Sequence, residues 1–286
     1  MSRVRDFADR VSNDRAFLDS LSHTLHLPDG SVRTAAVIGP AENDGVVVLA
    51  PTVPELGFVY APIVRALGSK FRVVLYEPEL SRTARTSLDE RTDELSMVIA
   101  AVAPLGAHVI AWSDGGSAAY RLALKRSALV RSLSLVGLAD EYRLPGPLNC
   151  LMVALDRLPL HLVTPPVLLR VLLSWFMGGT VVPRRWFFAE SKKIPRFGMF
   201  LKQSVLPCML EHSIQGDPLG MPSLLIGCDR DALTSQGQFE RMAAGMGPLT
   251  EFRVVKGGEH MLVYSSAAEV SLILQDFLAR VCRQGV

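Results

Sequence analysis

The residues Val109-Ile110-Ala111-Trp112-Ser113-Asp114-Gly115-Gly116 give the strongest structural signal in this chain. An apolar run typical of a buried strand leads directly into a helical pattern, with a serine at the junction. Small residues stand before and after Ser113 in the pattern small-x-nucleophile-x-small-small, which is typical of a nucleophile elbow. Ala111 fills the first small position, where glycine is more usual. Because short motifs also arise by chance, a plain helix cap with two permissive glycines is the alternative interpretation.

Apolar runs alternate with helical patterns over much of the chain. We expect strands at residues 46–50, 71–76, 107–112, 133–138, 223–226 and 251–255, and helices at 58–67, 88–102, 118–126, 236–246 and 267–280. An amphipathic helix over about residues 4–21 and a hairpin over 23–38 precede them. Continuous apolar strands that alternate with helices indicate a mostly parallel sheet with helices on both faces, so the predicted fold class is α/β.

The alternation stops between residues 140 and 217. Leu-, Val- and Trp-rich helical segments punctuated by prolines replace it there, and the alternation resumes afterwards. We therefore predict an α/β core formed by residues 1–139 and 218–286. Residues 140–217 are predicted to form a helical cap inserted between two strands of one sheet.

A histidine suited to general-base chemistry follows the last predicted strand. His260 precedes the C-terminal helix, and its loop can reach back over the sheet edge to Ser113. There it would remove the proton of the serine hydroxyl. The other histidines fall in the hairpin, in the strand before the elbow or in the predicted cap (His23, His26, His108, His161 and His212). We therefore predict that His260 is the catalytic histidine.

Three aspartates are candidates for the acid that orients this histidine. Asp231 lies deepest in the loop after the strand at 223–226, and it gives the chain order nucleophile, acid, histidine. Asp229 could pair with Arg230 instead, and Asp140 follows the preceding strand. We predict Asp231 and keep the other two as alternatives.

Composition excludes several classes of partner. The chain has 286 residues, with 30 basic and 28 acidic side chains and a formal net charge of +2, so no field for binding nucleic acid is expected. Its four cysteines are scattered without metal-ligand spacing, and we expect no metal and no cofactor. The N-terminus lacks the apolar core of a signal peptide, and the most apolar stretch, residues 165–179, is short and contains Arg170. We expect a cytoplasmic protein with no integral membrane segment and with a small-molecule substrate, and the apolar composition allows a homodimer.

Together these motifs resemble the α/β-hydrolase superfamily, over nearly the whole chain from His23 onward. The resemblance implies an α/β-hydrolase fold and an oxyanion hole formed by two backbone amides. The helix N-terminus itself makes the Asp114 amide the first donor. The resemblance implies the Thr52 amide as the second, although Ala50-Pro51-Thr52 replaces the family's usual His-Gly loop. Residues 76–81 also depart from the family pattern, which leaves the oxyanion geometry open.

Two groups within the superfamily are similar in more detail. The elbow Trp112-Ser113-Asp114-Gly115-Gly116 is similar to that of valacyclovir-hydrolase-like esterases, which implies an ester with an amino group facing the Asp114 carboxylate. The overall layout is similar to maspardin-like proteins, which are regarded mainly as binding or adaptor proteins.

The predicted function is that of a serine hydrolase. Its substrate would be an ester, thioester or lactone with an apolar acyl or aromatic part, because the cap that forms the roof of such sites is hydrophobic here. We expect Trp112, Trp175 and Phe176 to contact this part. The alternatives are a maspardin-like binding protein with a vestigial site, and a carbon–carbon hydrolase or lyase that uses the same triad.

Overall fold

A computed structural model describes residues 2–40, 45–51, 53–79, 86–142, 154, 166–194, 206–214 and 218–284. Its centre is an eight-stranded sheet with the order β1-β2-β4-β3-β5-β6-β7-β8. The strands are β1 (Ser22–His26), β2 (Val32–Ile38), β3 (Val46–Ala50), β4 (Arg72–Tyr76), β5 (Ala107–Trp112), β6 (Val130–Val136), β7 (Ser223–Cys228) and β8 (Thr250–Val255). The predicted hairpin forms the antiparallel β1–β2 edge, and all strands from β4 through β8 in this order pair in parallel. The predicted mostly parallel sheet is confirmed.

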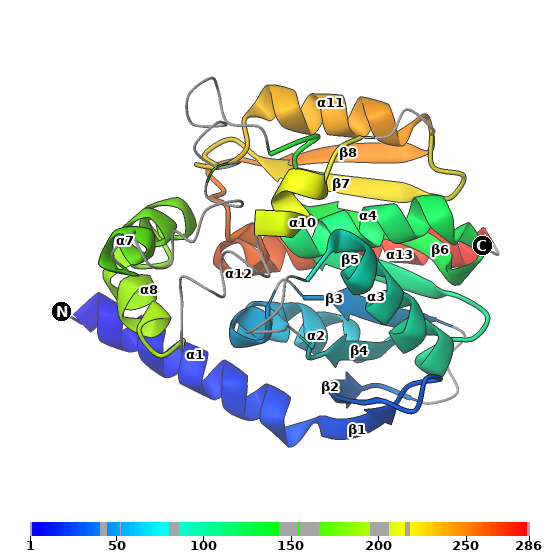
Figure 1. Cartoon of the computed structure of the whole chain (residues 1–286), viewed down its shortest axis with the longest axis horizontal. Helices are drawn as coiled ribbons and strands as arrows, with labels where there is room; N and C mark the ends of the chain where they lie inside the picture. The colour runs from blue at the N-terminus through cyan, green and yellow to red at the C-terminus, as the bar shows by residue number, and fades with distance from the viewer. Residues whose placement is uncertain are drawn as a thin grey trace.

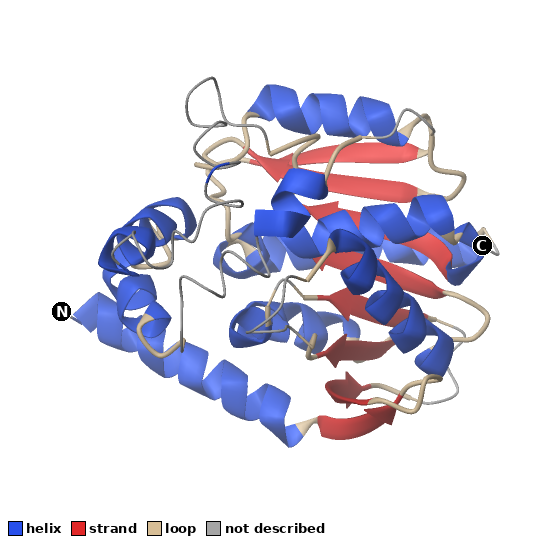
Figure 2. Cartoon of the chain, viewed as in Figure 1, coloured by secondary structure: helices blue, strands red, loops and turns tan. Residues whose placement is uncertain are grey.

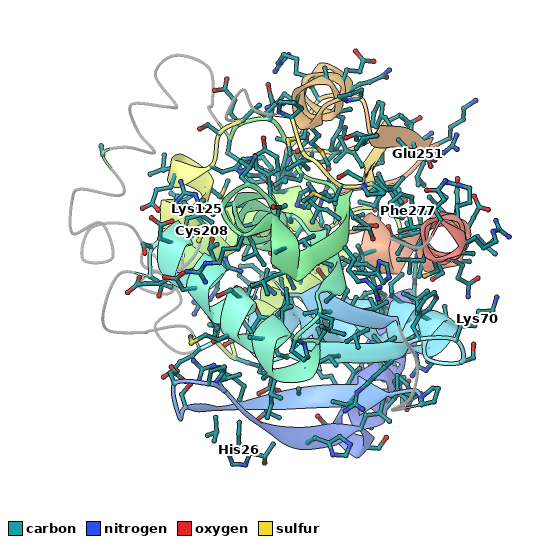
Figure 3. The ribbon with its side chains drawn as sticks, turned by 90° about the vertical axis from the view of Figure 1, so that its right-hand side faces the viewer. His26, Lys70, Lys125, Cys208, Glu251 and Phe277 are labelled. Carbon is teal, nitrogen blue, oxygen red and sulfur yellow. The ribbon has the colours of Figure 1, made fainter. Side chains whose placement is uncertain are left out.

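Helices cover both faces of this sheet (Figure 2). One face carries α2 (Ala61–Leu67) and α13 (Ala267–Arg283), whose apolar side chains pack with alternate residues of the central strands. The other face carries α3 (Leu88–Val102), α4 (Asp114–Lys125) and α11 (Gln236–Met246), which pack against the residues in between. Figure 3 shows α2 and α13 on the right of the sheet and α3 and α4 on its left. The two apolar layers explain why the central strands are apolar without alternation.

Side-chain caps set the start of two of these helices. Ser87 and Glu90 form a reciprocal capping box at the start of α3, and Ser235 and Gln238 form another at the start of α11. Each cap satisfies backbone N–H groups that have no partner within the helix. A short 3-10 helix, η1 (Pro54–Tyr60), links β3 to α2, and η2 (Ser127–Leu129) precedes β6.

The described helices of residues 140–217 lie between β6 and β7. They are α7 (Pro166–Met177), α8 (Arg184–Ser191) and α10 (Leu206–Glu211). Figure 1 shows α7 and α8 beside the N-terminal helix α1 (Ser2–Ser20), where the ring of Phe7 lies 4.9 Å from the ring of Trp186. The division of the chain into a core and a cap remains a prediction, since much of 140–217 falls outside the described residues. No helix in the described parts of the chain has the length and apolar character needed to cross a bilayer.

Candidate active site

Ser113 occupies a strained turn between β5 and α4. Its φ of 54° and ψ of −132° make it the one non-glycine residue with a positive φ in the described parts of the chain. Such a conformation costs about 1–3 kcal/mol and persists only where the surrounding structure imposes it. A Cβ atom on Gly115 would lie 2.6 Å from the carbonyl oxygen of Ala50, so only glycine lets the start of α4 pack this closely against the end of β3.

Three side chains form one hydrogen-bonded line at this turn. Oγ of Ser113 lies 2.9 Å from Nε2 of His260, and Nδ1 of His260 lies 2.8 Å from Oδ2 of Asp231. The side chains of His260 and Asp231 are fully buried. A carboxylate beside Nδ1 favours the tautomer in which Nε2 accepts the serine proton. The structure therefore brings together the serine, histidine and aspartate that the sequence singles out.

The carboxylate of Asp231 is held by its own loop. Its Oδ1 accepts hydrogen bonds from the backbone amides of Leu233, at 2.7 Å, and Thr234, at 3.0 Å. This fixes the other oxygen toward His260. The Cys228 thiol lies 3.9 Å from Oδ2, but burial, assisted by the nearby Asp231 charge, raises the pKa of this thiol above its ordinary value. Cys228 is thus a neutral neighbour that adds no second negative charge.

The two alternative acids are engaged elsewhere. Asp229 accepts a hydrogen bond from the backbone amide of Gly257 at 2.6 Å. Asp140 forms an ion pair with Arg241, with 2.5 Å between Oδ2 and Nε. Of the three candidates, Asp231 is the one whose carboxylate is hydrogen-bonded to His260 in the described residues, so the geometry favours it as the acid that orients the imidazole.

The predicted oxyanion donors belong to α4 and to the loop after β3. Asp114 is the first residue of α4, and the first N–H groups of an α-helix have no acceptor within the helix. The positive end of the helix dipole lies at the same place. Thr52 lies outside the described residues. Its neighbour Pro51 is buried, and the Pro51 carbonyl accepts a hydrogen bond from Arg91 at 2.9 Å.

A buried tyrosine ties the end of β3 to the end of β5. The hydroxyl of Tyr60 donates to the carbonyl of Ala50 at 3.0 Å and accepts from the amide of Trp112 at 2.8 Å. These two bonds hold the loop that begins at Pro51 beside the strand that ends at Ser113. Tyr60 therefore supports both sides of the turn.

The side chain of Asp114 is paired with a buried arginine. Its Oδ2 lies 2.7 Å from Nη1 of Arg91, and the side chain of Arg91 is only 3% exposed. The same Nη1 lies 3.5 Å from the sulfur of Cys208 in α10. A carboxylate that already neutralises a buried guanidinium is not free to bind the amino group of a substrate. The preference for cationic esters implied by the valacyclovir-hydrolase-like elbow is therefore not supported.

Sequence analysis missed Arg91 and Tyr60. Arg91 lies four and seven residues before Leu95 and Val98, two residues of α3 that are fully buried. Residues at this spacing share one helix face. A charged residue on the buried face of a helix requires a partner of opposite charge, which is the signal that could have found the pair with Asp114. Nothing in the local sequence marks Tyr60.

The residues predicted to contact substrate lie in different environments. Trp112 is fully buried, and its indole nitrogen donates a hydrogen bond to the carbonyl of His260 at 2.8 Å. It therefore supports the loop that carries His260, and a contact between Trp112 and substrate remains a prediction. Trp175 is 58% exposed, with the guanidinium of Arg184 4.1 Å from the centre of its ring, and Phe176 is half-buried.

A cavity of about 340 Å³ opens beside Pro51, between α1, η1 and α8. Its apolar lining includes Pro51, Leu56, Phe58, Tyr76, Trp186 and Phe187, and its polar lining includes Arg15, Asp19, Glu55, Glu77 and Glu190. Ser113, Trp175 and Phe176 are not among the described residues that line it. The cavity thus adjoins the loop of the predicted oxyanion hole rather than the nucleophile itself. The described residues include no cluster of three or more His, Cys, Asp or Glu side chains suited to a metal ion.

Comparison with known proteins agrees with this arrangement. The sequence pattern of the Alpha/beta hydrolase family matches residues 16–271. The chain belongs to the alpha/beta hydrolase family. This confirms the superfamily resemblance, whereas the finer likeness to maspardin-like proteins or valacyclovir-hydrolase-like esterases is not tested.

One protein is similar to this hydrolase in part of its sequence, and two solved structures are similar to it in fold. A protein of Caulobacter sp. (strain K31) named as carbamate hydrolase RutD is 37% identical over 92 residues, which are 30% of this chain and 34% of that protein. The chain therefore matches about a third of the length of this curated relative. A membrane phospholipase A, described as a bacterial virulence factor, has a TM-score of 0.74 at 17% identity, covering 96% of this chain and 92% of its own. An enol-lactonase from Burkholderia xenovorans LB400 has a TM-score of 0.69 at 16% identity, covering 90% and 100%. These structures share the fold with this hydrolase.

Proposed function

We propose that this hydrolase cleaves a carboxylic ester, thioester or lactone by acyl transfer through Ser113. The observation that carries the proposal is the continuous line from Ser113 through His260 to Asp231, at 2.9 and 2.8 Å. A nucleophile within hydrogen-bond reach of a base, with the base held by a third group, is the arrangement that activates a serine. The strained backbone at Ser113 supports the same role, because such strain gathers at functional sites.

Each group has a defined task in the first half of the reaction. Oγ of Ser113 attacks the substrate carbonyl carbon while Nε2 of His260 accepts the hydroxyl proton. Asp231 stabilises the imidazolium that forms and keeps its orientation. The carbonyl oxygen becomes an oxyanion, and we assign the Asp114 amide as its donor at the N-terminus of α4. The Thr52 amide remains our proposal for the second donor.

The second half returns the enzyme to its starting state. The tetrahedral intermediate collapses, the bond to the leaving group breaks, and His260 gives its proton to that group. Water then attacks the acyl-serine, again with His260 as base, and the carboxylic acid leaves. Ser113 and His260, with Asp231 orienting the imidazole, account for every proton transfer in this scheme without a cofactor.

The cavity beside Pro51 favours a substrate with an apolar acyl or aromatic part. Phe58, Trp186 and Phe187 line it, and Pro51 lies next to the predicted oxyanion donor. A carbonyl held at that donor would direct one of its substituents toward the cavity. We therefore propose that these residues, rather than Trp112, select the apolar group, while a contact with Trp175 or Phe176 of the predicted cap remains an expectation.

A binding protein with a vestigial site is the competing hypothesis, and a covalent probe separates the two. An alkyl fluorophosphonate should label the wild-type protein, and Ser113→Ala should lose the label and the hydrolysis of a panel of esters and thioesters. Loss of a triad nucleophile commonly lowers kcat by several orders of magnitude, about 10⁶-fold in a well-studied case. An unlabelled wild type with no activity on the panel would support the adaptor. Wild-type turnover by a folded Ser113→Ala protein would exclude Ser113 as nucleophile.

A further inference from the structure

Tyr142 is a buried tyrosine that the scheme above does not use. It follows β6, six residues beyond the end of that strand at Val136, and its side chain is 7% exposed. Its ring lies 5.6 Å from the ring of His212, whose Nε2 is hydrogen-bonded to the carbonyl of Ala139 at 2.8 Å. The ring is therefore held in one place by its neighbours.

The backbone that carries Tyr142 is anchored on two sides. Glu141 forms a β-bridge with Ser213, and its carbonyl accepts a hydrogen bond from the side chain of Gln238 at 3.0 Å. The carbonyl of Asp140 accepts another from the amide of Ile214 at 3.2 Å. Tyr142 thus stands on a fixed segment, which is what a group that positions a substrate requires.

The hydroxyl of Tyr142 is buried beside the nucleophile. No residue in the described parts of the chain forms a hydrogen bond of normal geometry with it. Burial raises the pKa of this phenol above its ordinary value, and the charges of Asp114 and Asp231 act in the same direction, while the adjacent Ser113 hydroxyl and Ala139 amide oppose them. The phenol therefore keeps its proton and can donate it in a hydrogen bond. The Ser113 hydroxyl beside it places the phenol at the nucleophile, where it can donate to an acceptor that the substrate brings.

The order of the strands in the sheet indicates which atom of the substrate accepts the hydrogen bond from Tyr142. β5, which leads to Ser113, lies between β3 and β6. The loop of the predicted oxyanion hole follows β3, whereas Tyr142 follows β6 on the opposite side of β5. His260 reaches Ser113 from the loop after β8, which is on the β6 side. Because His260 gives its proton to the leaving group, the leaving group must lie on this side as well.

We propose that the hydroxyl of Tyr142 donates a hydrogen bond to the leaving-group oxygen of the substrate, and that the Ser113 site therefore favours oxygen esters over thioesters. This inference rests on the proposed acyl transfer. The leaving oxygen gains negative charge as its bond to carbon breaks, so the hydrogen bond strengthens in the transition state and raises the rate. Sulfur is a weak acceptor, so a thioester gains much less from this hydrogen bond.

Ethyl hexanoate and S-ethyl thiohexanoate, which differ in one atom, test this preference. We expect Tyr142→Phe to lower kcat/KM for the ester on the order of 10- to 100-fold and to change that for the thioester less than about 3-fold. The matched control is Tyr120→Phe, which removes the hydroxyl of another buried tyrosine whose ring lies 6.1 Å from the same His212. It should leave the ratio of the two rates unchanged. The melting temperature and the rate of fluorophosphonate labelling show that each variant keeps a native Ser113 site.

Equal losses on ester and thioester, or an unchanged ester rate, would overturn the role of Tyr142 while leaving the proposed function intact. A wild type that the fluorophosphonate does not label and that cleaves neither compound would instead count against the proposed function itself. A selective loss on the ester in Tyr142→Phe, absent in Tyr120→Phe, supports the inference, because a merely structural change would affect both compounds alike.

Discussion

The guanidinium of Arg91 lies 2.7 Å from the carboxylate of Asp114, and the side chains are 3% and 9% exposed. This buried pair links α3 to the first turn of α4, directly after the candidate nucleophile. The second terminal nitrogen of Arg91 binds the carbonyl of Pro51, next to the predicted oxyanion donor Thr52. One side chain thus fixes both segments that are proposed to form the oxyanion hole.

Arg91→Met should destabilise the protein and lower its activity. The variant leaves the Asp114 carboxylate buried without its partner, which costs about 3–5 kcal/mol. Urea denaturation measures the change. The control is Lys125→Met, which breaks the ion pair of Lys125 with Asp89 at 2.6 Å, where both side chains are more than half exposed (Figure 3). Exposed pairs contribute about 0–1 kcal/mol. Similar decreases in the free energy of unfolding in the two variants would mean that the buried pair stabilises the fold no more than an exposed pair does.

Asp231→Asn should damage catalysis far more than Asp229→Asn or Asp140→Asn. An asparagine cannot stabilise the imidazolium and favours the wrong tautomer of His260, which lowers kcat about 10⁴-fold in a serine protease with the same arrangement. Asp229 and Asp140 bind a backbone amide and an arginine, so their variants should keep most of the activity. The measurement is kcat/KM for the three variants on one ester. A large loss of kcat/KM in Asp140→Asn, with little loss in Asp231→Asn, would assign the role of the acid to Asp140, which follows β6.

Most of the sheet could be predicted from the sequence because its strands are short, apolar and separated by helical patterns. The predicted bounds of β3 and β5 are confirmed, since both strands are buried on two faces and contain no polar break except His108. The sequence pattern predicts the start of β6 three residues late, at 133 instead of Val130. Arg131 and Ser132 interrupt its apolar run, but Arg131 is only half-buried, and the hydroxyl of the buried Ser132 is hydrogen-bonded to His108 at 2.8 Å.

The site was less predictable than the sheet. The order of Ser113, Asp231 and His260 along the chain follows from the positions of strand ends, which sequence patterns locate well. The Arg91–Asp114 pair and the Tyr142 hydroxyl depend on helices and loops that meet only in the folded protein. The hydrogen bond of the Trp112 indole could not be anticipated either, because its acceptor is a backbone carbonyl in a loop 148 residues away.

The stability of the protein should fall as the pH drops below about 6.5. Burial lowers the pKa of His108 and of His212 to about 4, whereas an unfolded chain titrates these groups near the ordinary value of 6.5. Between these values the unfolded state binds up to two more protons than the folded state, so the free energy of unfolding rises with pH, by up to about 2.7 kcal/mol per pH unit. This stabilisation is complete above the unfolded value and is lost as the pH falls toward 4.

Urea denaturation at pH 7, 6 and 5 checks this dependence. The double variant His108→Gln and His212→Gln should show a flatter profile between pH 6.5 and 5. His26→Gln is the control, since His26 is exposed on the β1 edge of the sheet (Figure 3) and should leave the profile unchanged. An identical slope in all three proteins would show that the two buried histidines are not the source.

Ser113→Gly and Ser113→Ala should differ in stability although both lack the nucleophile. Alanine keeps a Cβ atom in a backbone conformation with φ of 54° and ψ of −132°, whereas glycine adopts positive φ without steric cost. Relief of about 1–3 kcal/mol of strain exceeds the entropy cost of glycine, about 0.5–1 kcal/mol, so the glycine variant should be the more stable by about 1 kcal/mol. Urea denaturation measures the difference in the free energy of unfolding. The control is Ala16→Gly on the exposed face of α1, where the backbone has ordinary helical geometry. There glycine should make the protein less stable than alanine does. An alanine variant that is more stable than the glycine variant would show that the turn at Ser113 stores no strain, and it would remove one of the two structural supports for a nucleophile at this position.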